Sequence, residues 1–139
     1  MATSKAKTSS RPKVVFQRTD LFNETFKKYA TNEVVQAKFQ DFIKSKKENP
    51  LQPFGSVDER FRGDGPLGQS GVTHCHLTHN INLIYTKSGS NPLLIQLIWI
   101  GVHDEIGTGQ PPNKKLQKNA AKKFLTAQPE GEVFENKGK

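Results

Sequence analysis

Apolar residues in the first third of the chain recur at spacings that predict one short strand and two helices. The run at residues 13–17, Lys-Val-Val-Phe-Gln, is a strand candidate, and Thr19 or Asp20 can cap a helix that follows it. A second helix can begin at Thr31 or Asn32 and end, after a lysine-rich last turn, before the next proline. The apolar faces of these helices are formed by Phe22, Phe26 and Tyr29 and by Val35, Phe39, Phe42 and Ile43.

The middle of the chain carries strand patterns instead. Strands are expected at residues 71–78, 81–87 and 93–100, and the last is apolar at nearly every position, as a strand covered on both faces would be. Between residues 51 and 70, prolines and glycines mark a connection that contains one weak edge strand, at residues 57–61. We therefore expect an α+β fold, with helices on one side of a mostly antiparallel twisted sheet.

A further helix is expected at about residues 113–126. Its apolar stripe is narrow and consists of Leu116, Ala120 and Phe124. The rest of its surface is basic, so the helix can either dock on the sheet or contact phosphates. The lysines concerned are Lys114, Lys115, Lys118, Lys122 and Lys123.

The net charge of +8 is concentrated at the two ends of the chain. Residues 1–12 carry a net charge of +3 and residues 110–139 carry +4, whereas residues 13–109 carry only +1. Basic ends favour a polyanionic partner, because lysine and arginine release counterions from a phosphate backbone. The alternative is that these ends only keep the protein in solution. The first 12 residues are small and polar, so we expect a disordered arm there.

Length and cysteine content limit the class of protein. A chain of 139 residues fits one domain, and one cysteine excludes an internal disulfide framework. The sequence contains neither an 18-residue apolar run nor a charged-then-apolar leader. We therefore expect a cytoplasmic protein that does not bind to a membrane.

Three of the four histidines fall within six positions, in the segment Gly-Val-Thr-His-Cys-His-Leu-Thr-His-Asn at residues 71–80. Because side chains alternate across a strand, His74 and His76 should emerge on the same face. If residues 81–87 and 93–100 pair antiparallel, the second strand ends near the start of the first and brings His103 towards His76. Two imidazoles in one cleft are suited to proton transfer near neutral pH.

The expected strand and two helices are followed by three motifs, Gly-Val-Thr-His-Cys-His-Leu, Asn-Leu-Ile-Tyr and Ile-Gly-Val-His. This order resembles the RelE/ParE superfamily of small bacterial toxins. Within that superfamily the chain most resembles the YafQ-like branch. Members of that branch typically contain Gly-Tyr-Arg-(acid)-x-His-(Ile/Leu), then Leu-Ile-Tyr, then Gly-(Thr/Ser)-His. The likeness covers residues 13–107 and leaves residues 108–139 as a basic C-terminal extension. The chain departs from that pattern at Asn80, where aspartate is usual, and at Ile81 and Gly107, where aromatic residues are usual.

The resemblance implies an endoribonuclease, or mRNA interferase, that cuts messenger RNA on the ribosome in a bacterial or phage-infected cell. It implies an antitoxin protein as a partner and no cofactor. By position, His76 falls on the catalytic strand histidine of that branch, and His103 falls on the histidine after the final strand.

Metal-free RNA cleavage requires a base for the ribose 2′-hydroxyl, an acid for the departing 5′-oxygen and donors for the charged phosphorane. His76 and His103 can share the acid and base roles, and His74 can assist them or lower the basicity of its neighbour. The expected product is a 2′,3′-cyclic phosphate. The candidates for binding phosphate, besides the lysines above, are Arg60, Arg62 and Asn80.

Three other interpretations remain open. The histidines could bind a metal, with His79, Asp104 or Glu105 completing the set, although no carboxylate stands at a clear spacing. The chain could instead be a non-catalytic relative that binds RNA, DNA or a protein through its basic ends. An action on gyrase, as in the ParE branch, is more distant because that branch does not need these histidines.

Overall fold

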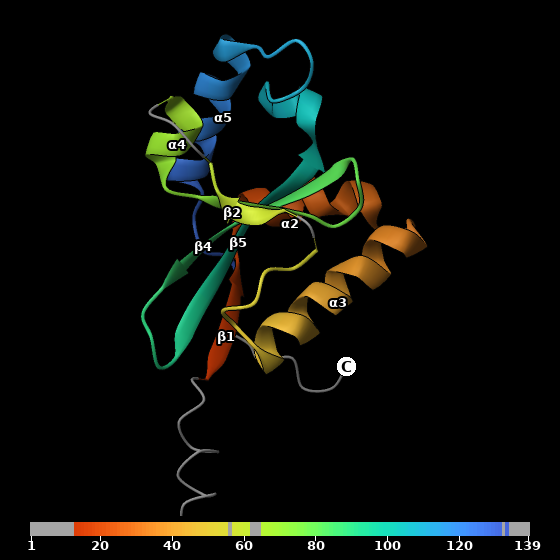
Figure 1. The fold of residues 1–139 in the computed structure, drawn as a ribbon, viewed down its shortest axis with the longest axis vertical. Coiled ribbons are helices and arrows are strands. Elements are labelled where there is room, and N and C mark those ends of the chain that lie inside the picture. The colour runs from red at the N-terminus through yellow and green to blue at the C-terminus, as the bar shows by residue number, and fades with distance from the viewer. Residues whose placement is uncertain (1–12, 56, 62–64, 132, 134–139) are drawn as a thin grey trace, which may run out of the picture.

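A five-stranded sheet forms the centre of the molecule. The computed structural model describes residues 13–55, 57–61, 65–131 and 133, so the basic arm expected at residues 1–12 lies outside the described residues. The strand order is β1-β5-β4-β3-β2, with β1 parallel to β5 and every other pair antiparallel (Figure 1). The strands are β1 (Val14–Arg18), β2 (Asp58–Arg60), β3 (Thr73–His76), β4 (Ile81–Ser88) and β5 (Leu93–Val102).

Two capped helices follow the first strand, as the sequence predicts. In α2 (Asp20–Phe26) the Thr19 hydroxyl accepts a hydrogen bond from the Phe22 amide at 3.1 Å. A 3₁₀ turn, η1 (Lys27–Tyr29), leads to α3 (Glu33–Glu48), where the Asn32 side chain caps the first turn. Both helices pack on the same face of the sheet, where their aromatic side chains meet the inward residues of β1, β4 and β5.

The other face of the sheet is also covered. Pro66–Ser70 forms α4, His103–Ile106 forms the 3₁₀ turn η2, and Lys114–Thr126 forms α5. Figure 1 shows α4 and α5 grouped at one end of the molecule, away from α3. A second apolar cluster joins them to the sheet; it includes Leu67, Val72, Ile84, Ile98, Trp99, Ile106, Ala120, Ala121 and Phe124.

The expectation of helices on one side of the sheet is therefore wrong. The apolar pattern of β5 is that of a strand covered on both faces. In the structure Leu97 packs in the first cluster and Trp99 packs in the second. A register shift between Ile84 and Tyr85 accompanies this arrangement, and Ile98 lies at the shift on the partner strand.

A buried ion pair ties α3 to the edge strand β2. Lys46 and Asp58 have side chains that are 2% and 1% exposed, and the Lys46 Nζ lies 2.5 Å from an Asp58 oxygen. Asp58 also accepts hydrogen bonds from the Tyr85 hydroxyl and the Phe54 amide, and Lys46 donates to the Gln52 carbonyl. Because both side chains have these additional partners, their hydrogen-bonding groups are satisfied. The pair therefore fixes the position of β2 against the core.

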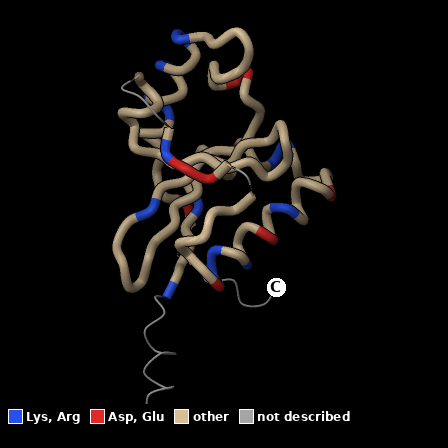
Figure 2. Tube along the Cα trace, in the orientation of Figure 1, with Lys and Arg blue, Asp and Glu red and all other residues tan. Residues whose placement is uncertain are grey.

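Surface charge follows the division that the sequence predicts. Figure 2 shows basic residues along α5, and that helix contains no acidic residue. On α3, by contrast, basic and acidic residues alternate along the exposed side. Among the described residues, no helix is long and apolar enough to cross a membrane.

Candidate active site

The strand register places the histidines of β3 beside the end of β5. His76 pairs with Asn82 on β4, and Asn82 pairs with Gly101 on β5. Directly opposed residues project from the same face, so this row shares the face that carries α4 and α5. His103 begins the 3₁₀ turn just after β5 and thus lies at the end of the same row.

Three imidazoles meet at this end of the sheet. The ring centroids of His76 and His103 are 5.1 Å apart, with the planes nearly perpendicular at 81°. The centroids of His74 and His76 are 6.3 Å apart. Chain reversal at residues 88–92 therefore brings His103 to His76, and this expectation from the sequence is confirmed. His79 lies in the exposed turn before β4 and outside the group.

A hydroxyl sets the orientation of His103. The Thr108 Oγ1 lies 3.0 Å from the His103 Nδ1 and also donates to the His103 carbonyl oxygen at 3.3 Å. When the hydroxyl donates to the carbonyl, its oxygen accepts from Nδ1–H, which leaves Nε2 directed away from this contact. His103 can therefore exchange a proton through Nε2 while Thr108 holds the ring.

His76 and His74 are both held towards the neutral form. Partial burial lowers the pKa of His76, and the nearby His103 lowers it further. Burial is also the main cause that lowers the pKa of His74, opposed by a backbone hydrogen bond at Glu59. The His74 ring stacks on Phe61 at a centroid distance of 4.1 Å, with the planes 6° apart. His74 therefore packs against the edge of the site, while His76 faces its partner imidazole.

A cavity opens beside His103. Its volume is about 570 Å³, and its lining includes Asn80, Asp104, Thr108 and Gln110. Asn80 stands in the turn between β3 and β4, where its side-chain oxygen accepts a hydrogen bond from the Thr78 hydroxyl at 2.9 Å. The cavity thus brings one expected polar residue, Asn80, to His103. Among the described residues, neither lysine nor arginine lines it.

Asn82 is a candidate site residue that the sequence did not suggest. It is 1% exposed, and neither polar atom of its amide has a hydrogen-bond partner within the part of the chain that the structure describes. An unpaired buried amide is costly, so its presence next to His76 calls for a reason. The available signal was a single polar residue inside the apolar run Ile-Asn-Leu-Ile-Tyr.

The remaining predicted phosphate-binding residues lie elsewhere. Arg60 pairs with Thr73, so its Cβ leaves the sheet on the face opposite His74, and the structure does not bring it to the histidine pair. Arg62 lies outside the described residues. The α5 residues Lys114, Lys115, Lys118 and Lys122 are exposed along that helix and do not line the cavity beside His103. Because β2 ends at Arg60, the alternation of side chains along a strand does not predict the faces of the residues that follow it.

Metal ligation was the competing chemistry for this cluster. Within residues 13–55, 57–61, 65–131 and 133, no group of three or more histidine, cysteine or carboxylate side chains is placed to hold a metal ion. The single cysteine, Cys75, is buried on the opposite face of β3, and burial raises the pKa of its thiol well above the usual value.

Comparison with solved structures places this fold beside a known toxin. A YoeB/ParE toxin from Agrobacterium tumefaciens superposes with a TM-score of 0.52 at 21% sequence identity, over 63% of this chain and 97% of the toxin. The chain has a RelE/ParE-type fold. The α+β architecture predicted from the sequence, with its N-terminal strand, two helices and mostly antiparallel sheet, is thereby confirmed. Neither a protein-family model nor a curated protein matches the sequence.

Proposed function

We propose that this protein is a metal-independent endoribonuclease that uses His76 and His103 as its base and acid. The observation that carries the proposal is the 5.1 Å separation of the two rings beside an open cavity. At this distance the charge of His103 lowers the pKa of His76, so a neutral imidazole can stand beside an imidazolium. A base and an acid are then present together, as cleavage by a neighbouring hydroxyl requires.

The lowered pKa of His76 assigns it the role of base. His76 takes the proton of the ribose 2′-hydroxyl, and the resulting oxygen attacks the adjacent phosphorus. The bond from phosphorus to the 5′-oxygen breaks, and His103 gives that oxygen a proton through Nε2. The products are a 2′,3′-cyclic phosphate and a free 5′-hydroxyl, and the proton balance of the pair is restored by exchange with water.

The residues around the histidine pair suit a nucleotide whose phosphate contacts few charged side chains. Side-chain amides of Asn80 and Gln110 line the cavity and can donate to phosphate oxygens. The imidazolium of His103 supplies the nearby positive charge. We assign overall affinity for RNA to the lysines of α5 and to the basic ends of the chain, whose contribution depends on salt.

The fold supports a toxin as the biological role. A solved structure that resembles this chain is a toxin, and the histidine phrases resemble the YafQ-like branch. We therefore propose messenger RNA on the ribosome as the substrate and an antitoxin protein as the partner that silences the activity, in the cytoplasm of a bacterial or phage-infected cell.

Substitution of the two histidines tests the proposal. Induced wild-type protein should arrest growth and cut ribosome-bound messenger RNA, leaving 2′,3′-cyclic phosphate ends. His76→Ala and His103→Ala should each lower the cleavage rate at least about tenfold, because each removes one proton-transfer group. His79→Ala is the matched control, since His79 is exposed and outside the pair. Equal cleavage by all four proteins would refute the proposal.

A second candidate function is binding without catalysis. No lysine or arginine of the described part of the chain lines the cavity beside His103, and this favours it, because the phosphorane then has few cationic donors there. In that case the protein binds RNA, DNA or a protein through its basic ends. It would retain RNA in a filter-binding assay at low salt and leave the RNA intact.

A further inference from the structure

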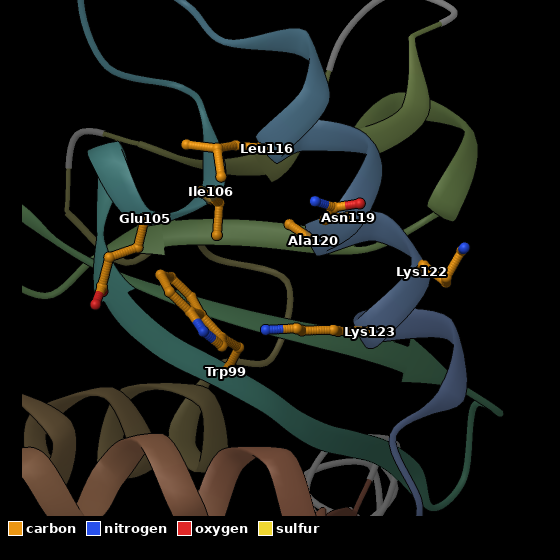
Figure 3. Close-up of a pocket in the computed structure, with 8 residues that line it drawn as sticks. All are labelled: Trp99, Glu105, Ile106, Leu116, Asn119, Ala120, Lys122 and Lys123. Atoms are coloured by element: carbon orange, nitrogen blue, oxygen red, sulfur yellow. The ribbon is translucent and has the colours of Figure 1, made fainter.

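A second hollow on the same face of the sheet lies between Trp99 and α5. Its volume is about 300 Å³, and Figure 3 shows Trp99, Ile106 and Leu116 around its apolar part, with Lys123 extending from α5 towards Trp99. Lys122 also lines the hollow, but its ammonium group points away from Trp99. A neighbouring hollow of about 380 Å³ extends it towards α2 and shares Trp99, Leu116 and Lys123. We refer to the two together as the Trp99 groove.

The Trp99 groove is continuous with the row that carries the histidine pair. A Cβ added to Gly101 would lie 2.5 Å from two ring carbons of Trp99, so the indole lies directly against the backbone of Gly101. Gly101 pairs with Asn82, and Asn82 pairs with His76. Two strand spacings therefore separate this part of the indole from the His76 backbone, about 10 Å across the sheet.

The chemistry of the Trp99 groove combines an apolar floor with unpaired positive charge. Two acidic residues line it, Glu24 on the side of α2 and Glu105. Glu105 already accepts a hydrogen bond from the Val102 amide at 3.1 Å and forms an ion pair with Lys28 at 3.4 Å. Lys122 and Lys123 form no ion pair within the part of the chain that the structure describes. The Trp99 indole N–H likewise has no hydrogen-bond partner among the described residues, and Figure 3 shows it on the side of Lys123.

We propose that the Trp99 groove is a subsite for a neighbouring nucleotide of the same single-stranded RNA that the histidine pair cleaves. The base would lie between Trp99 and Leu116, with the indole N–H donating to a base acceptor, and Lys122 and Lys123 would contact the adjoining phosphate. This inference rests on the proposed function. General electrostatic attraction of RNA to α5 would neither place one base in the Trp99 groove nor give two of the five lysines on that helix a particular role.

Trp99 gives a direct test because it is the single tryptophan of the chain. An oligonucleotide with 2′-O-methyl riboses lacks the attacking hydroxyl and remains uncut, so binding can be followed by tryptophan fluorescence in the full-length wild-type protein. We expect saturable quenching of the fluorescence as the oligonucleotide is added. Removing the base from the nucleotide that occupies the Trp99 groove should abolish most of the quenching.

Two double variants separate the subsite from general charge. Lys122→Ala/Lys123→Ala should weaken binding at least about tenfold and reduce the quenching at saturation. Lys114→Ala/Lys115→Ala removes the same charge from the start of α5, where the residues do not line the Trp99 groove, and should weaken binding about threefold or less. Circular dichroism would verify that both variants are folded.

Equal weakening by both double variants, or binding without any change in fluorescence, would overturn the subsite. Quenching by an acidic peptide but not by the oligonucleotide would also overturn it and would indicate a protein partner instead. Cleavage distinguishes these failures from failure of the proposed function. Loss of the subsite with cleavage that still depends on His76 and His103 would leave the nuclease intact, whereas absence of cleavage with base-dependent quenching would leave only RNA binding.

Discussion

At the scale of single residues, Asn82 is the clearest sign that this end of the sheet does more than pack. Aliphatic residues fill most other buried positions of β4, and the Asn82 amide has no described partner. A fold under selection for stability alone would favour leucine there. We infer that the amide is kept for the proposed site, because it lies directly opposite His76 on β3.

Asn82→Leu should therefore separate stability from activity. The substitution removes an unpaired buried amide, so the free energy of unfolding should rise by about 1 kcal/mol. The cleavage rate should fall about tenfold while substrate binding changes little, because the site loses the polar group directly opposite His76. Urea denaturation and single-turnover cleavage measure the two effects. An unchanged cleavage rate in a stabilised variant would remove Asn82 from the site.

Other residues show where sequence reasoning succeeded and where it could not. The histidine pair was predictable, because strand alternation and one chain reversal suffice to bring His76 and His103 together. The burial of Lys46 was not, because lysine in a last helical turn is ordinarily explained by the helix dipole. Its partner Asp58 lies 12 residues further along, beyond any local pattern. The face on which Arg60 lies depended on the register between β2 and β3, which the sequence left open.

At the scale of elements, long periodic segments were predictable and short ones were not. The helix at Glu33–Glu48 and the strands at Ile81–Ser88 and Leu93–Val102 lie within two residues of their expected bounds. The helix α4 was missed because its five residues, Pro66–Ser70, are too few to show a period. Its ends are nevertheless recognisable, with proline in the first turn and Gly71 at φ 79° closing the last.

The edge strand β2 depends on the buried pair of Lys46 and Asp58 for its place. Asp58→Ala should lower the free energy of unfolding by about 3–5 kcal/mol, since it leaves the Lys46 charge buried without its partner. Adding Lys46→Met should restore a substantial part of that loss by removing the unpaired charge. Thermal or chemical denaturation of the two variants provides the comparison. A double variant no more stable than Asp58→Ala would show that the charge is not the cause.

At the scale of the whole molecule, the sheet separates two tasks. One face packs α2 and α3 over a core of aliphatic and aromatic side chains, and the other carries the histidine pair, the Trp99 groove and the basic α5. This division explains why β5 is apolar on both sides and why the charge of the chain is uneven. In the proposed account RNA lies across the second face, with the scissile phosphate at the histidines and the next base at Trp99.

The pH dependence of single-turnover RNA cleavage tests the central claim most directly. Because burial and His103 lower the pKa of His76, the base should lose activity only as the pH falls below about 6.5. We predict that the cleavage rate of wild type falls along this acid limb. In His76→Ala the limb on the acid side should disappear, with a residual rate at least about tenfold lower. A profile of the same shape and height in wild type and His76→Ala would contradict acid–base catalysis by this pair.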